Sequence, residues 1–273
     1  MTASRPRLTG HRRIEGMLLD AFGFAPGDMV AAVGGGGKTS LLFRLALEAR
    51  ERGIPAAVTT TVKFTQPAGL PMPPVVTAES GELAARAASA LAEHDAVTLI
   101  SGRGERGRML GFAPDAVDLL AGPGRLVLVE ADGSAHRPFK APAAHEPVIP
   151  AGATAVVVCV GAAVLGQPLD ARWVHRPELA GPLAGLHPGA PVDAEAAARV
   201  LLHPAGGRKG VPAGARLCAL VNTPGAPSAA AFALAERLQA GGYVRVVVAT
   251  AHAGIVHEVR QGGVVSAPSA DYR

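Results

Sequence analysis

The stretch DMVAAVGGGGKTSLLFRLALEARERG, residues 28–53, indicates the fold class of the whole chain. It predicts a short buried strand, a turn of four glycines, and a helix that presents Leu41, Leu42 and Leu45 on one face and ends at Gly53. Because glycine has no Cβ, the backbone of such a turn can wrap an anion and point its N–H groups inward, aided by the helix dipole. This layout, with Lys-Thr at the helix start, predicts a phosphate-binding loop, or P-loop.

The predicted P-loop matches a shortened consensus. The full pattern G-x-x-x-x-G-K-[ST] requires glycine where the chain has Ala32, and the remaining G-x-x-G-K-T resembles the ATP loop of the Mur ligases. Lys38 is expected to reach the β- and γ-phosphates as a catalytic residue, and the Thr39 hydroxyl is expected to ligate Mg²⁺. The alternative is a flexible connector that precedes a lysine by chance. The nucleotide-binding residues predicted in this loop are Gly34, Gly35, Gly36, Gly37, Lys38, Thr39 and Ser40.

Strand-like runs alternate with helical patterns along the chain. Short Val-rich runs lie at 28–33, 55–61, 96–100, 125–132, 154–160, 215–222 and 244–250. Their nearly continuous hydrophobicity is typical of strands buried on both faces. Helical patterns fall between them, at 39–52, 78–93, 114–121, 175–184, 193–202 and 228–240. The sequence therefore predicts an α/β fold, a three-layer P-loop NTPase-like domain with a mostly parallel sheet and helices on both faces.

We expect this single domain to span 27–273, after an N-terminal arm and short helix over 1–26. The segment IVHEVRQGGVVSAP near the end predicts a small hairpin that turns at Gly262 and Gly263. The longest apolar run, 154–165, is about a dozen residues, short of the roughly 18 that a membrane span needs. The basic N-terminus is followed by no apolar segment, so we expect a cytoplasmic protein without a membrane partner.

Composition and charge exclude several classes of function. The 273 residues, 49% of them hydrophobic, suit one large α/β domain with a sizeable core. The net charge is +4, but the arginines are scattered and aromatic residues make up only 4%, which argues against a nucleic-acid partner. Cys159 and Cys218 lie within apolar runs and are expected to be small buried side chains, neither bridged nor metal-bound.

A second informative stretch is LVLVEADGSAHRPFKAPAAHEPVIP, residues 126–150. Glu130 and Asp132 are two apart at the end of a predicted strand, so their side chains share a face near the edge where α/β sheets bind ligands. One carboxylate is expected to hold the Mg²⁺ water shell and the other to position or deprotonate a nucleophile, which makes both predicted catalytic and metal-site residues. Solvated turn residues are the alternative. Lys140 is expected to meet a phosphate or an acidic substrate.

The same stretch contains His136, His145 and Glu146. Their irregular spacing favours a role in loop scaffolding over a metal site.

Five segments together resemble the YqeC family of selenium-dependent hydroxylase accessory proteins: VGGGGKTSL, VTTTVKF, EADGSAHRPFKAPAAHEPVIP, HRPELAG and HPAGGRKGVPAGAR. The resemblance runs from about Gly27 to Asn222. It implies a P-loop protein that assists maturation of selenium-containing molybdenum hydroxylases, with a nucleoside triphosphate and a molybdenum hydroxylase or cofactor-handling protein as partners. At matching positions, it implies that the nucleotide loop is 34–39, the acidic strand end is Glu130 and Asp132, and the neighbouring strand end comprises Thr59, Thr60, Thr61 and Lys63.

One position departs from the family pattern. Family members often show an Asn-Lys pair where this chain has Asn222 followed by Thr223. Asn-Lys pairs are associated with guanine recognition in GTPases, so the departure favours ATP over GTP, with Asn222 kept as a predicted nucleotide-binding residue.

Other polar stretches leave two interpretations open. Arg103, Arg106 and Arg108 either close over phosphates, one of them as an arginine finger, or belong to a solvated loop. The hydroxyls of Thr60 and Thr61 either meet Mg²⁺ water, with Lys63 at the γ-phosphate, or these residues simply favour a strand. The remaining candidates are His175, Arg176 and Lys209. They either line a pocket for an acceptor substrate or have ordinary roles at a helix start and in a turn.

Three functions fit these observations. The first is a Mg²⁺-dependent nucleotide hydrolase or transferase that drives a maturation step. The second is a Mur-like ATP-dependent ligase or a small-molecule phosphotransferase. The third is a non-catalytic nucleotide-binding switch that docks on a partner protein.

Overall fold

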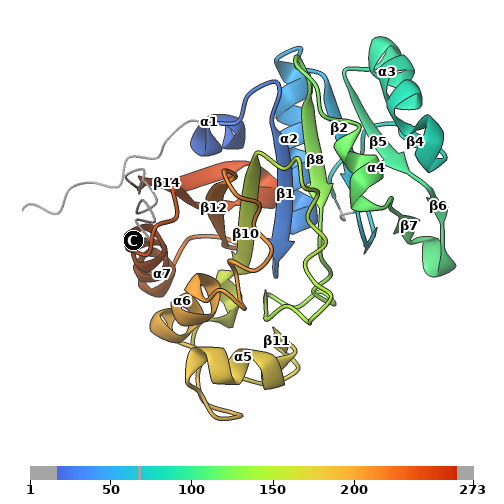
Figure 1. Cartoon of the computed structure of the whole chain (residues 1–273). Helices are drawn as coiled ribbons and strands as arrows, with labels where there is room; N and C mark the ends of the chain where they lie inside the picture. The colour runs from blue at the N-terminus through green and yellow to red at the C-terminus, as the bar shows by residue number, and fades with distance from the viewer. Residues whose placement is uncertain (1–16, 67–68, 263–273) are drawn as a thin grey trace, which may run out of the picture.

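A nine-stranded sheet forms the centre of the computed structural model, which describes residues 17–66 and 69–262, except for the side chain of Arg106 (Figure 1). All neighbouring strands are parallel except the pair β13 and β14. The strands, in sheet order, are β14 (Ile255–Gln261), β13 (Arg245–Thr250), β12 (Arg216–Asn222), β10 (Ala155–Gly161), β1 (Met29–Gly34), β8 (Leu126–Glu130), β2 (Ala56–Thr60), β5 (Ala96–Ile100) and β4 (Val75–Thr77).

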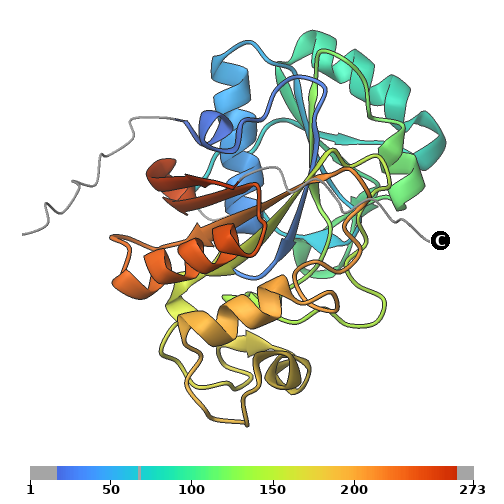
Figure 2. The same cartoon turned by 60° about the vertical axis from the view of Figure 1, so that its left-hand side comes forward.

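Helices cover both faces of this sheet, because alternate strand residues point into different cores. Val30 and Ala32 pack with α1 (Leu18–Phe22) and α2 (Lys38–Glu51). Ala31 and Val33 belong to the core of the other face. Figure 2 shows α2 on one side of the sheet and α3 (Leu83–Glu93) on the other. The elements of that face are α3, α4 (Pro114–Asp118), α6 (Ala194–Leu202) and α7 (Ala229–Ala240), with α5 (Pro177–Ala184) against α6.

The predicted fold class is confirmed: a mostly parallel sheet lies between two helical layers. Every strand expected from a Val-rich run is present, and β2, β5, β8 and β10 are buried along their whole length. Two expected helices start later than predicted. Residues 80–82 form a separate 3₁₀ turn before α3, and residues 174–175 form a short strand before α5. The described part of the chain contains no helix that is long and apolar enough to cross a membrane.

The last described strand has a partner that the sequence did not predict, and the predicted hairpin at Gly262 and Gly263 is not tested. Strand β14 forms a hairpin with the preceding strand β13, and the connection turns at Gly254, whose φ is 70°. The expected partner arm beyond Gly262 lies outside the described residues. The prediction of an arm over 1–26 and one domain over 27–273 stays a prediction, since 1–16 are likewise outside.

Two small sheets lie beyond the ends of the central strands. One pairs β9 (Phe139–Lys140) with β11 (Val174–His175). The other is antiparallel and has the order β3 (Lys63–Phe64), β7 (Met109–Leu110), β6 (Gly102–Arg103). Strands of two residues show no hydrophobic period, so no sequence pattern predicts them.

The direction of the chain reverses around β1. From β1 the chain runs through α2 to β2, then to the edge strand β4 and its neighbour β5, returns through β8 and continues to β10 on the other side of β1 (Figure 1). In open parallel sheets the carboxyl ends of strands at such a reversal form a crevice that binds ligands. The candidate site is therefore expected where β1 and β8 end, at Gly34 and Glu130.

Candidate functional site

The turn between β1 and α2 requires all four of its glycines. Gly34, Gly36 and Gly37 have φ values of 92°, 72° and 114°, in the left-handed region that side chains disfavour. Gly35 has ordinary backbone angles, but a Cβ there would lie 2.9 Å from the Cα of Phe139. Three glycines are thus required by conformation and the fourth by the close approach of the chain leading into β9.

The backbone N–H groups of this turn fall into two sets. The amide of Gly34 donates to Asp132 Oδ2 at 2.9 Å, and that of Gly35 donates to the carbonyl of Cys159 at 2.9 Å. The amides from Gly36 to Ser40 donate no hydrogen bond to any described residue. These consecutive donors at the start of a 14-residue helix form a concentration of positive partial charge.

Lys38 is the first residue of α2 and is 4% exposed. Its ammonium donates to the carbonyl of Gly34 at 2.6 Å and lies 3.2 Å from Asp132 Oδ1. Burial opposes the charge on Lys38, but Asp132 and Glu130 outweigh it and raise the pKa of the ammonium. Lys38 is therefore charged at neutral pH, and its ammonium is held by the Gly34 carbonyl of the glycine-rich turn and by Asp132.

Thr39 and Glu130 form the second polar pair of the site. The Thr39 hydroxyl donates to Glu130 Oε2 at 2.6 Å, which joins the first turn of α2 to the end of β8. Burial raises the pKa of Glu130, while the ammonium of Lys38 and the hydrogen bond from Thr39 oppose that rise. A hydroxyl and a carboxylate oxygen thus lie together beside the unbonded amides, and Mg²⁺ prefers oxygen ligands of this kind.

A cleft with a volume of about 480 Å³ opens in front of these groups. Its walls come from the glycine-rich turn, from the small sheet that contains β3 and β7, and from the segment after β8. The lining residues are Gly36, Gly37, Lys38, Thr39, Ser40, Lys63, Phe64, Thr65, Gln66, Arg108, Glu130, Gly133, Ser134, Ala135 and His136. This volume falls within the range of pockets that hold a small ligand.

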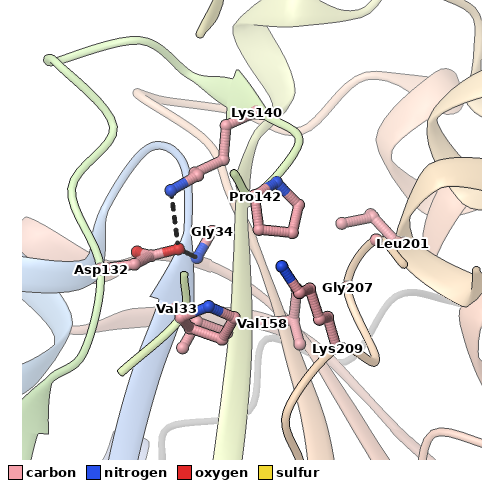
Figure 3. A pocket seen from close by; sticks show the side chains of 11 residues that line it. Val33, Gly34, Asp132, Lys140, Pro142, Val158, Leu201, Gly207 and Lys209 are labelled. Atoms are coloured by element: carbon pink, nitrogen blue, oxygen red, sulfur yellow. Dashed lines mark hydrogen bonds and ion pairs between the residues drawn. The ribbon is translucent and has the colours of Figure 1, made fainter. Parts of the chain in front are cut away.

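Asp132 lies at the back of the site, in a chain of buried charges. Its Oδ2 is 3.0 Å from the ammonium of Lys140 (Figure 3). The same ammonium donates to Glu146 Oε2 at 2.6 Å. Arg176 then binds both oxygens of Glu146, at 2.7 and 3.1 Å. Burial raises the pKa of Glu146, but the bonds from Arg176 and Lys140 outweigh it and lower that pKa to about 2. The order of charges is Lys38, Asp132, Lys140, Glu146 and Arg176.

Lys140 is held by ion pairs outside the lining of the large cleft. Its ammonium donates to the carbonyl of Gly133, is almost fully buried among Asp132 and Glu146, and does not line the large cleft. It lines instead a second cavity of about 20 Å³, seen in Figure 3, together with Lys209, whose ammonium holds the carbonyls of residues 143 and 144. Such a volume has room for about one water molecule. The phosphate contact of Lys140 stays a prediction that its present ion pairs disfavour.

The other predicted residues lie around the loop in different roles. The Thr60 hydroxyl is buried and donates to the carbonyl of Glu130, and Thr61 donates to the carbonyl of Val148. Lys63 is exposed and lines the cleft. Asn222 Oδ1 accepts from the amide of Ala251, and its side chain packs against the turn, since a Cβ on Gly37 would lie 2.6 Å from Asn222 Nδ2. Nucleotide contacts by Thr60, Thr61 and Asn222 stay predictions.

Comparison with known proteins places this geometry in a family. The family model described as YqeC protein matches residues 30–178. The chain belongs to the YqeC family. It is 33% identical over 196 residues, 71% of this chain and 75% of the relative, to the uncharacterized protein YqeC of Escherichia coli strain K12. No solved structure matches the chain.

The YqeC match covers the glycine-rich turn, Glu130 and the buried charge chain as far as Arg176, whereas Asn222 lies beyond it. Sequence reasoning did not anticipate that Glu146 and Arg176 extend the site through Lys140. The proximity of Glu146 and Arg176 to the site appears only in the folded chain, because the pairing of β9 with β11 brings residues 139–140 and 174–175 together.

The segment after β8 contributes another feature of this YqeC chain that the sequence did not indicate. Ala135 and His136 have φ values of 48° and 59° and both line the cleft. Two consecutive non-glycine residues in the left-handed region are costly, and such strain concentrates at functional sites. The described residues contain no group of three or more His, Cys, Asp or Glu side chains that could hold a metal ion. The scaffolding interpretation of His136 stays a prediction.

Both cysteines are free and buried, as predicted. Burial raises the pKa of the Cys159 thiol, and it raises that of Cys218 to about 11. Neither thiol is therefore an activated nucleophile at neutral pH.

Proposed function

We propose that this YqeC protein binds a nucleoside triphosphate, preferentially ATP, in the large cleft and hydrolyses it in the presence of Mg²⁺. The observation that supports this most is the run of unbonded amides from Gly36 to Ser40, beside the charged ammonium of Lys38. Such a turn at a helix start is a P-loop, and the cleft in front of it offers donors and positive charge to a polyphosphate.

The residues present also fit Mg²⁺. Thr39 and Glu130 offer a hydroxyl and a carboxylate oxygen within 2.6 Å of each other, next to the amides that would hold the phosphates. We propose that Thr39 ligates the ion directly and that Glu130 holds it directly or through water. Asp132 is surrounded by Lys38, Lys140 and the amide of Gly34, so it is better placed to anchor the loop than to ligate a metal. Bound Mg²⁺ would neutralise charge on the β- and γ-phosphate oxygens.

Hydrolysis in this cleft transfers the γ-phosphoryl group of the nucleotide to water. A water oxygen forms a bond to the γ-phosphorus, and the bond between that phosphorus and the β–γ bridging oxygen breaks. The electron pair leaves with ADP, and the water proton passes to solvent. The unbonded turn amides and the ammonium of Lys38, both of which line the cleft, stabilise the negative charge on the phosphates during this transfer.

The resemblance to selenium-dependent hydroxylase accessory proteins supports a proposal about partners. A molybdenum hydroxylase or a cofactor-handling protein would use the nucleotide cycle during maturation. A binding assay between the purified proteins, with and without MgATP, tests this part separately from hydrolysis.

Phosphate release from MgATP, compared with ATP in EDTA, tests the nucleotide function. We expect release with Mg²⁺ that EDTA abolishes, and binding of MgATP that is tighter than binding of MgGTP. Tight binding without release would instead favour the nucleotide-binding switch. Absence of binding would contradict the proposed function.

A further inference from the structure

The small sheet of β3, β7 and β6 forms one wall of the large cleft and is anchored to the helix that carries the P-loop. Phe64 and Met109 are opposite each other in the β3–β7 pair and are buried in the core beside α2. The ring of Phe64 lies 6.0 Å from that of Phe43, a residue of α2. The sheet is thus fixed relative to Lys38, at the start of the same helix.

Side chains next to these anchors face the cleft. In paired strands the side chains alternate between two faces, so the neighbours of buried Phe64 and Met109 fall on the opposite face. Lys63, Thr65 and Arg108 are among those neighbours, and all three line the cleft, as Phe64 itself also does. The two cations are exposed and form no ion pair with any described residue.

The backbone holds Arg108 in place. Its carbonyl accepts from the amide of Gly104 at 2.8 Å, and its amide donates to the carbonyl of Glu105 at 3.2 Å. Arg103 is opposite Met109 in the β6–β7 pair, on the face away from Arg108, and does not line the cleft. The structure thereby separates two arginines that the sequence left equivalent.

We propose that Arg108 contacts the terminal phosphate of the bound triphosphate and supplies, from within the chain, the positive charge that stabilises the transferring phosphoryl group. This inference rests on the proposed function. A guanidinium presents parallel N–H donors that match phosphate oxygens, and among the described residues Arg108 has no carboxylate partner to leave first. Lys63, on the same wall, adds a second positive charge near the same phosphate. The YqeC cleft therefore distinguishes triphosphates from diphosphates, and turnover needs no arginine from a partner.

The test compares Arg108→Ala with Arg103→Ala as the matched control from the same sheet. Three quantities are measured for each protein: the Kd of MgADP, the rate of phosphate release from MgATP, and the amount of MgADP trapped with aluminium fluoride, a mimic of the transferring phosphoryl group. In Arg108→Ala we expect release to fall by roughly 10³-fold and trapping to be lost, with the Kd of MgADP changed less than about threefold. Arg103→Ala should match the wild type in all three.

Two results overturn the inference. If Arg108→Ala releases phosphate and traps aluminium fluoride as the wild type does, Arg108 has no role in transfer although the proposed hydrolysis stands. If the wild type binds MgADP but neither releases phosphate nor traps aluminium fluoride, the cleft binds nucleotide without an arginine in position, and the inference fails while nucleotide binding survives. If the wild-type protein binds no nucleotide at all, the proposed function itself is wrong, and the inference about Arg108 fails with it.

Discussion

The Thr39 hydroxyl donates a 2.6 Å hydrogen bond to the Glu130 carboxylate across 91 positions of sequence. This bond joins the start of α2 to the end of β8, two elements whose relative position is set by the parallel pairing of β1 and β8. It brings two oxygen donors to the mouth of the cleft, beside the glycine-rich turn. The proposed Mg²⁺ site therefore combines a residue of the local motif, Thr39, with Glu130, which the sheet order brings beside it.

Replacing Glu130 with Gln tests that site. The amide can still accept the hydrogen bond from Thr39 but offers Mg²⁺ no negative charge. We expect the gain in ATP affinity that Mg²⁺ provides to shrink by about tenfold or more, with ATP binding in EDTA retained. Calorimetric titration with and without Mg²⁺ measures both. An equal gain in the variant and the wild type would remove Glu130 from the metal site.

Gly35→Ala tests the packing of the turn. The new Cβ would lie 2.9 Å from the Cα of Phe139, where backbone rather than a flexible side chain must move. We expect a loss of about 1–3 kcal/mol in the free energy of unfolding, together with weaker MgATP binding. Urea unfolding measures the first quantity. Gly81→Ala is the control, because a Cβ there meets nothing within 4 Å; equal stability of the two variants would refute the packing argument.

The depressed pKa of Glu146 predicts a pH-dependent contribution to stability. The pKa falls from an ordinary 4.5 to about 2 in the folded chain, so the contribution is complete above about pH 4.5 and is lost as the pH falls toward 2. Its size is on the order of 3 kcal/mol at neutral pH. Glu146→Gln should therefore unfold more easily at pH 7 and approach the wild type as the pH falls.

Urea unfolding of both proteins between pH 7 and pH 3 measures this gap. The control is Glu195→Gln, which alters an ion pair that is half exposed and should leave stability nearly unchanged at each pH. A gap between Glu146→Gln and the wild type that stays constant with pH would show that the carboxylate charge is not the source of the stability.

Much of the fold was predictable because the determining signals are local and repeated. Val-rich runs such as 155–161 can be buried on both faces only in the interior of a layered sheet, and the glycines before Lys38 mark the turn at its edge. The short strands β3 and β7 were not predictable, since two residues have no period. They decide which arginine faces the cleft, so the role proposed for Arg108 could not be read from the sequence.

The site was predictable to the same extent. Lys38, Thr39 and Glu130 stand at positions where motif and strand end coincide, and they meet as expected. From the sequence, Lys140 is expected to meet a phosphate or an acidic substrate. Its partners, Asp132 and Glu146, become apparent only when the loop folds back, and they hold it behind the cleft.

Calorimetric titration of the protein with MgATP and MgGTP, in the wild type and in Lys38→Ala, tests the central claim most directly. Arg50→Ala, at the exposed end of the same helix, is the control. We expect the wild type and Arg50→Ala to bind MgATP more tightly than MgGTP, and Lys38→Ala to bind neither although it unfolds cooperatively. Undiminished binding in Lys38→Ala, or no binding by the wild type, would contradict the assignment of a nucleotide site to the glycine-rich turn.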